Sequence, residues 1–119
     1  MEKINVPEKL ELFDDYWNPR IVAELNGQYV KLVKFKGAFV WHTHDNEDEM
    51  FYVVRGELSI EFRDKTVHLK EKEFMVVPRG VEHRPSAQKE AHVLLFEPKH
   101  TLNTGNINNE FTRDNLEKI

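Results

Sequence analysis

The sequence predicts an all-β fold, a single small antiparallel sandwich or barrel with one short helix and an extended tail. Three observations favour this class. Between residues 20 and 97 the chain is a succession of short runs rich in β-branched and aromatic residues. Turn residues separate these runs at intervals of roughly ten residues, as is typical of sandwiches and barrels. The 119 residues suffice for one domain, and no internal repeat divides them.

The one predicted helix covers residues 7–17. Pro7 lies where a first helical turn accepts a proline, and Leu10, Phe13 and Trp17 recur at helical spacing. Pro19 ends the segment. We therefore expect a short amphipathic helix before the barrel.

The barrel itself is predicted over residues 20–97. Residues 57–62 alternate most clearly, with Leu58, Ile60 and Phe62 on the inner face. Residues 93–96 are apolar on both sides, as expected of a strand that is covered on both faces. The predicted strands are 20–25, 28–35, 39–43, 49–54, 57–62, 66–69, 74–78 and 91–97, with a shorter piece at 83–86.

The tail covers residues 98–119. It contains five asparagines, a turn at Thr104 and Gly105, and few large apolar residues. We expect an extended, partly mobile flap that ends in a weak helical turn.

Composition excludes several classes of protein. Apolar residues make up 39% of the chain and charged residues 32%, which is the balance of a globular protein. No charge-free run approaches the ~20 residues of a spanning helix, and the first residues lack an apolar signal segment, so we expect a cytoplasmic protein with no membrane partner. The net charge is −4 and the basic residues are scattered, which argues against nucleic acid. With no cysteine, a metal site must use imidazole, carboxylate or water.

Six histidines are many for this length, and three of them form a pattern with one glutamate. His42 and His44 alternate on a predicted strand, so their side chains share a face. Glu49 opens the next strand, and His83 follows a turn that contains Pro78 and Gly80. Three imidazoles and one carboxylate suit Fe(II), Mn(II), Ni(II), Co(II) or Zn(II), with positions left for water or substrate.

These residues resemble the two sequence motifs of the cupin superfamily. The second motif is similar to residues 78–83, and the first is similar, in order and near its spacing, to Gly37, His42, His44, Glu49 and Gly56. The resemblance spans roughly residues 28–97, and the whole chain looks like small single-domain bacterial cupins. It implies a small antiparallel jelly-roll barrel that holds one divalent transition-metal ion (Fe, Mn, Ni, Co or Zn) by the ligands His42, His44, Glu49 and His83.

Two positions depart from the second motif. Lys72 stands where the motif usually opens with glycine, which suggests a less tight turn before Phe74. Ala87 stands where the motif usually closes with asparagine, which removes a polar group near the site.

Other residues keep simpler interpretations. Asp48 is an alternative ligand to Glu49, although it would point to the opposite face and belongs to an acidic run typical of a solvated turn. His68 and His100 are expected in solvent, and His92 in the core or in a pocket. Arg79 and Arg84 flank the site as anion-binding or solvated groups. Trp41 and Phe39 are interpreted as packing residues.

Two functional classes follow from a site of this kind. A divalent ion with three neutral imidazoles and one carboxylate favours anionic chelating ligands. The first hypothesis is therefore a metal-dependent enzyme of isomerase, lyase or dioxygenase type that acts on a small polar or anionic metabolite. The second is a non-catalytic metal- or sugar-binding or sensing module. The catalytic residues stay unknown. A general base is needed for isomerase or lyase chemistry, and the sequence offers only His92 and Glu82 as candidates.

A homodimer is also predicted. A single barrel of this size has exposed sheet edges, which another chain commonly covers. The helix with Leu10, Phe13 and Trp17, or strand 28–35, is the expected contact.

Overall fold

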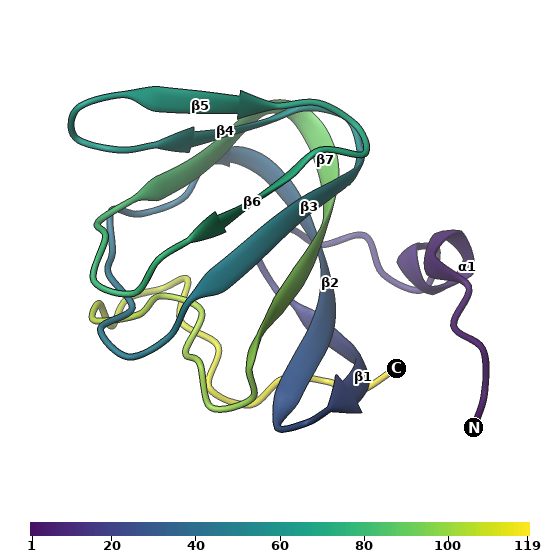
Figure 1. The fold of residues 1–119 in the computed structure, drawn as a ribbon. Coiled ribbons are helices and arrows are strands. Elements are labelled where there is room, and N and C mark those ends of the chain that lie inside the picture. The colour runs from purple at the N-terminus through teal and green to yellow at the C-terminus, as the bar shows by residue number, and fades with distance from the viewer.

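Seven strands wrap into an antiparallel barrel that is not fully closed in the computed structural model, which describes residues 1–119 (Figure 1). The main sheet has the order β1-β2-β7-β3-β6, and a hairpin of β4 and β5 joins it through β7. The predicted fold class is confirmed. The strands are β1 (Arg20–Leu25), β2 (Gln28–Ala38), β3 (Glu49–Arg55), β4 (Leu58–Glu61), β5 (Thr66–Leu69), β6 (Phe74–Val77) and β7 (Arg84–Pro98).

The long strand β7 is the spine of the sheet, because it pairs with β2, β3 and β4. The sequence predicts two pieces here, at 83–86 and 91–97, but the structure joins them. A register shift between the pairs Phe35–Ala91 and Gly37–Ala87 accommodates the polar residues 88–90 within the continuous strand. Ala87, buried opposite Gly37, lies in this connection.

Strand 39–43 is not formed, although His42 and the neighbouring His44 keep their expected side. A single isolated bridge joins His42 and His83, whose amides and carbonyls exchange two hydrogen bonds of 3.0 Å. The next residue, Thr43, pairs with the tail instead of a strand: its carbonyl accepts from the Asn106 amide at 3.0 Å. The C-terminal tail therefore replaces a neighbouring strand at this place.

The helix α1 (Val6–Leu10) is shorter than the predicted helix 7–17. After α1 the chain turns, and residues 11–19 form an anchored arm. The Trp17 amide donates to the Lys34 carbonyl at 2.9 Å, and the Trp17 indole donates to the Lys36 carbonyl at 2.9 Å. Trp17 has φ of 60°, which is incompatible with a continuing helix. Leu10, Phe13 and Trp17 are nevertheless all buried. Their spacing therefore predicts the burial of these three residues correctly, but the prediction that all three lie on one helix is wrong.

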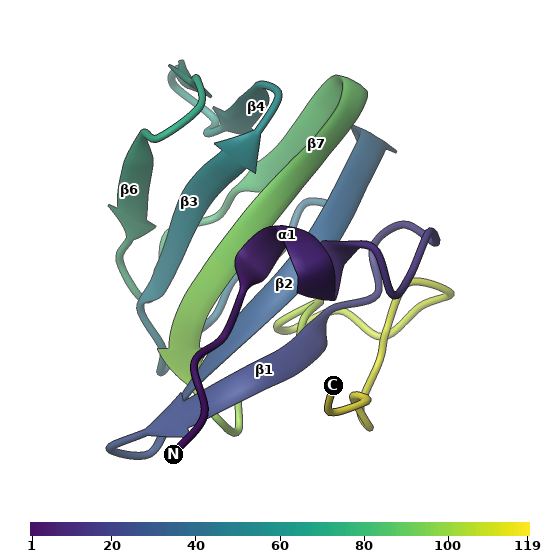
Figure 2. The ribbon, with the colours of Figure 1, turned by 90° about the vertical axis from the view of Figure 1, so that its right-hand side faces the viewer.

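The helix and the arm cover different surfaces. Figure 2 shows α1 across the outer face of the sheet, over β2 and β7. There Leu10 and Phe13 pack with Leu32 in a small outer cluster, whereas Trp17 enters the main core. None of the chain's helices has the length and apolar character needed to cross a membrane.

The barrel interior is apolar and follows the expected alternation. In β3 the residues Glu49, Phe51 and Val53 point inward, and in β4 Leu58 and Ile60 do so. Glu49 is therefore on the same inner face as the core, as predicted.

The turn before β6 stays tight despite the lysine at its glycine position. Lys72 itself adopts a positive φ of 70°, and its amide donates to the Val53 carbonyl at 2.8 Å. The Glu73 amide donates to the Lys70 carbonyl at 3.0 Å. The less tight turn expected from the sequence is therefore wrong, because a lysine accepts the left-handed conformation here.

The tail, residues 98–119, packs along the barrel instead of forming a free flap. Thr104 is fully buried, and Lys118 forms an isolated bridge with Ile21 of β1. The chain ends in extended backbone, with the Ile119 amide donating to the Ile21 carbonyl at 3.0 Å, and not in a helical turn.

The strand expected as a dimer contact, 28–35, lies inside the sheet between β1 and β7. The apolar helix positions Leu10 and Phe13 are covered within the chain. The exposed large apolar side chains of the sheet are instead Leu25, at the end of the edge strand β1, and Phe74 and Val76, on the edge strand β6.

Candidate metal centre

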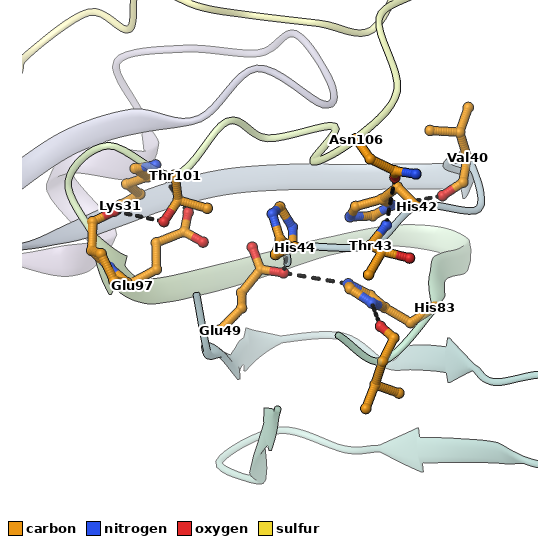
Figure 3. Close-up of polar contacts among 12 residues, drawn as sticks. Lys31, Val40, His42, Thr43, His44, Glu49, His83, Glu97, Thr101 and Asn106 are labelled. Carbon is orange, nitrogen blue, oxygen red and sulfur yellow. Dashed lines mark hydrogen bonds and ion pairs between the residues drawn. The ribbon is translucent and has the colours of Figure 1, made fainter. Parts of the chain in front are cut away.

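The structure brings the four predicted ligands together inside the barrel (Figure 3). One ligand atom from each residue lies within 4.8 Å of the others, and all four side chains are buried. His42 and His44 come from the segment after β2, Glu49 is the first residue of β3, and His83 immediately precedes β7. The site is thus assembled at strand ends from three separate parts of the chain.

Two of the imidazoles have a fixed orientation and tautomer. His42 Nδ1 lies 2.8 Å from the Val40 carbonyl, and His83 Nδ1 lies 2.9 Å from the Val81 carbonyl. A carbonyl oxygen only accepts, so each Nδ1 carries the proton and each Nε2 keeps its lone pair. Such carbonyl contacts commonly orient the histidines of metal sites.

The inner atoms of the cluster have no hydrogen-bond partner. Glu49 Oε1 lies 3.4 Å from His44 Nε2 and 3.5 Å from His83 Nε2. All three atoms are buried and unpaired, which is costly for polar groups. Ligands at ~2.1 Å from a tetrahedral ion lie about 3.4 Å apart. The donor set therefore fits a divalent ion that would satisfy these atoms at once.

The pKa values favour a ligand-ready state. Burial and the neighbouring charge of His83 lower the pKa of His42 from 6.5 to about 4, so this imidazole is neutral near neutral pH. Burial alone would raise the pKa of Glu49, but its interactions with His44 and His83 hold it well below its usual range. Neutral imidazole and carboxylate are the forms that bind metal ions.

A second buried polar cluster lies beside the first, and the sequence analysis missed it. Lys31 Nζ donates to Glu97 Oε1 at 2.9 Å, and both side chains are 1% exposed. Burial and the charge of Glu49 raise the pKa of Glu97, while Lys31 opposes them. The available signal was a charged residue at an inward position of an apolar strand: Lys31 alternates with Val33, and Glu97 with Leu95.

The tail supports the ligand segment directly, which the sequence analysis also missed. The Thr43 amide, between the two histidines, donates to Asn106 Oδ1 at 2.8 Å. Gly105 lies so close that a Cβ atom there would be 2.2 Å from the Thr43 carbonyl oxygen. Only glycine allows this approach. The tail thus fixes the backbone that carries His42 and His44.

A cavity of ≈ 20 Å³ adjoins the ligand cluster, enough for one water molecule. His42 and Glu49 lie in its wall, together with a set of apolar and aromatic side chains. These include Trp17, Val33, Phe35, Phe39, Phe51 and Leu95, with Pro19, Pro85 and Asn103 completing the lining.

The alternative ligand Asp48 lies outside the site. Its Oδ1 accepts from the Arg79 amide at 2.9 Å, and its side chain is about half exposed. Arg84 is also engaged elsewhere, in an ion pair of 2.8 Å with Glu61. The two flanking arginines therefore do not contact the ligand cluster.

The remaining histidines and candidate bases are also outside. His68 and His100 are exposed, as expected. His92 lies on the outer side of β7, where Nε2 is 2.6 Å from Glu90 Oε2, so the pocket role considered for it is not supported. Glu82 is exposed and pairs with Arg63 at 2.7 Å. Neither candidate base reaches the cavity.

Comparisons with known proteins agree with this architecture. The family profile described as "Cupin domain" matches residues 30–97, more than half of the chain. A cupin-2 domain containing protein from Shewanella frigidimarina NCIMB 400 is 46% identical, with 81% of this chain and 94% of that chain covered and a TM-score of 0.80. Protein NMB1881 from Neisseria meningitidis is 33% identical, with 82% and 100% covered and a TM-score of 0.76.

A curated relative gives a shorter match. The uncharacterized protein YdbB of Bacillus subtilis (strain 168) is 42% identical over 64 residues, which are 53% of this chain and 57% of that protein. The chain thus matches little more than half the length of this relative.

Proposed function

The chain belongs to the cupin domain family, and on that premise we propose that it is a metal-dependent enzyme acting on a small polar or anionic metabolite. One divalent transition-metal ion is held by His42, His44, Glu49 and His83. The observation that carries the proposal is the convergence of buried, unpaired ligand atoms on one point, with 4.8 Å as the largest separation. A folded protein seldom leaves several buried polar atoms unpaired around a common centre unless a ligand completes them.

The residues of the chain orient the metal ligands and set the polarity around the metal ion. Val40 and Val81 hold two imidazoles by their carbonyls, and Glu49 contributes one negative charge. The apolar wall beside His42 and Glu49 excludes bulk water from the ligand. A bound divalent ion supplies Lewis acidity toward ligand oxygens, or redox chemistry in the case of iron.

A non-catalytic binding or sensing module is the second candidate, and one observation favours it. Apart from His42 and Glu49, no titratable side chain lines the cavity. An isomerase or lyase needs a general base within hydrogen-bond reach of the substrate. The only further polar residue in the wall is Asn103, which is not a base.

Elemental analysis followed by a substrate screen tests both candidates. The purified protein is expected to contain one equivalent of a divalent transition metal. A screen of small organic acids, run under air and under nitrogen, then separates the reaction types: oxygen consumption supports a dioxygenase, and turnover without oxygen supports an isomerase or lyase. The His83→Ala variant is the matched control and should be inactive. Ligand binding without turnover would support the binding module, and metal-free wild-type protein that takes up no metal would contradict both.

The active form is proposed to be a homodimer. Phe74 and Val76 are 59% and 50% exposed on the edge strand β6, and such edges are commonly covered by another chain. Light scattering is expected to give twice the chain mass of 14.2 kDa. The Val76→Lys variant should shift the protein toward the monomer. A wild-type mass of one chain at micromolar concentration would contradict this proposal.

A further inference from the structure

The cavity beside the ligand cluster has an unusual wall for a protein that acts on a polar metabolite. Trp17 forms part of it, and its ring stacks on Phe35 at 4.2 Å and on Phe39 at 4.8 Å between centroids. Phe51 and Leu95 also line the cavity. Apart from His42, Glu49 and Asn103, the lining of the cavity is thus made of apolar and aromatic side chains.

The one other polar side chain in the wall, Asn103, is a neutral amide that is held by the tail. Asn103 donates through Nδ2 to the Phe111 carbonyl at 2.9 Å, and its Oδ1 accepts from the Arg113 amide at 2.9 Å. Both polar atoms of Asn103 are therefore tied to the tail, and its amide carries no charge that could pair with a charged ligand.

No cation lines the cavity to pair with a second negative charge on a ligand. The buried ammonium groups near the core are bound elsewhere: Lys31 contacts Glu97, and Lys34 donates to the Phe13 carbonyl at 2.6 Å. Three arginines form ion pairs with carboxylates outside the cavity, namely Arg63 with Glu82, Arg79 with Asp48 and Arg84 with Glu61. A charged group in the apolar part would lose its hydration without compensation.

Trp17 also limits the size of the space. The free volume of ≈ 20 Å³ accepts a group about as large as a water molecule or a methyl group. Trp17 belongs to the anchored arm, residues 11–19, and is fixed by hydrogen bonds to β2. This wall is therefore contributed by a segment outside the barrel strands.

We propose that the cavity takes a small, uncharged, apolar group of a ligand whose oxygen atoms bind the metal, and that Trp17 sets the size limit. This inference rests on the proposed function and narrows its substrate class to compounds with one chelating head and a short apolar body. Sugar phosphates and dicarboxylates are excluded as ligands of this cavity, because their second charge would meet an apolar wall.

Three hydroxamates with the same metal-binding head test the inference on the metal-loaded protein. Acetohydroxamate has a methyl body, benzohydroxamate a phenyl body, and the monohydroxamate of succinic acid a charged body. Wild-type protein is expected to bind acetohydroxamate at least about tenfold more tightly than either of the others by calorimetry. Equal or tighter binding of the charged compound would overturn the proposal.

The Trp17→Ala variant tests the size limit. It should bind benzohydroxamate at least about tenfold more tightly than wild-type protein does, while the charged compound stays weak. Trp41→Ala is the matched control, because the Trp41 ring lies outside the cavity beneath the Arg63 guanidinium, 3.8 Å from its centroid. Unchanged benzohydroxamate binding in Trp17→Ala would show that Trp17 does not set the limit. If that variant does not fold, Trp17→Phe keeps the stacked geometry and should give a smaller gain in the same direction.

A measurement without metal separates this inference from the proposed function. In metal-free Trp17→Ala, indole should raise the unfolding temperature, whereas indole-3-acetate at the same concentration should not. Both results are independent of metal binding, because the protein contains no ion in this measurement. Failure of wild-type protein to bind metal would contradict the proposed function and the metal-bound head of the ligand, but not the apolar pocket. Equal stabilisation by the neutral and the charged indole would contradict the apolar pocket alone.

Discussion

Two buried polar clusters lie next to each other in the barrel, and they satisfy their polar atoms in different ways (Figure 3). Lys31 and Glu97 contact each other directly at 2.9 Å, and one carboxylate oxygen of Glu97 is left without a partner. The ligand cluster leaves three convergent atoms unpaired, on His44, Glu49 and His83. The pair of Lys31 and Glu97 contains its own counter-charge, whereas the ligand cluster lacks one.

The difference shows that burial of charged residues does not by itself indicate a binding site. An ammonium and a carboxylate in contact neutralise each other, and such a pair can be a purely structural element. Imidazoles held by backbone carbonyls cannot pair with one another, because each presents a lone pair to the same centre. Convergence of acceptors, more than burial, distinguishes the candidate metal centre.

The largest expected effect comes from removing a ligand. His83→Ala should lower metal affinity by more than about 100-fold, because even residues that only support a ligand contribute 10–100-fold. Elemental analysis after dialysis measures the loss, and His42→Ala and His44→Ala should behave alike. His68→Ala and His100→Ala are the controls and should keep stoichiometric metal. Metal loss in His68→Ala, together with retention in His83→Ala, would place the site elsewhere.

Breaking the self-contained pair should affect stability. Lys31→Met leaves Glu97 buried without its counter-charge, so the free energy of unfolding should fall by about 3–5 kcal/mol. The double variant Lys31→Met/Glu97→Leu removes both charges and should recover most of this loss. Urea unfolding of the metal-free proteins measures both changes. A single variant as stable as wild-type protein would mean that the pair is not neutralised as described.

Removing the metal should weaken the fold without abolishing it. The core of the barrel, including Phe51, Val53 and Val93, is complete without an ion. A chelator should therefore leave a β-rich circular dichroism spectrum and a cooperative unfolding transition. The expected loss is about 3–4 kcal/mol when free metal had been several-hundred-fold above its dissociation constant. An unfolded metal-free protein would instead make the centre a structural site.

Acid should destabilise the metal-free protein, because the unfolded chain binds protons that the buried ligand cluster does not take up. The pKa of His42 is about 4 in the folded chain and near 6.5 in the unfolded chain, so only the unfolded chain binds this proton between those values. Stability therefore falls as the pH drops from about 6.5 to about 4, by about 3 kcal/mol for this residue. Glu49, with its lowered pKa, adds a loss in the same direction at lower pH. Urea titrations across this range measure the slope, and His42→Gln should flatten it; an unchanged slope would contradict the assignment.

The clustering of the four candidate ligands was predictable because each belongs to a short sequence motif with a recognisable geometry. Side-chain alternation places His42 and His44 together, and the turn from Pro78 to Gly80 directs His83 inward. The segment around His42 has a single bridge, to His83 just before β7, yet this bridge preserves the alternation. The prediction of a strand was therefore wrong, while the prediction of a shared face was correct.

The remaining features depend on contacts between distant segments. Gly105 and Asn106 reach Thr43 only when the tail folds back, and no spacing along the chain indicates this. Lys31 and Glu97 meet because β2 and β7 pair in one register. The spacing of Leu10, Phe13 and Trp17 predicts burial on one side, and an anchored arm satisfies that pattern as well as a helix does.

Anomalous X-ray diffraction from crystals of the metal-loaded protein, recorded on both sides of the absorption edge of the bound metal, tests the central claim most directly. One anomalous peak is expected in each chain, about 2.0–2.2 Å from His42 Nε2, His44 Nε2, His83 Nε2 and one Glu49 oxygen. The neighbouring pair of Lys31 and Glu97 should show no peak and keep its contact of 2.9 Å. A peak elsewhere in the chain, or none in protein that binds stoichiometric metal in solution, would contradict the account.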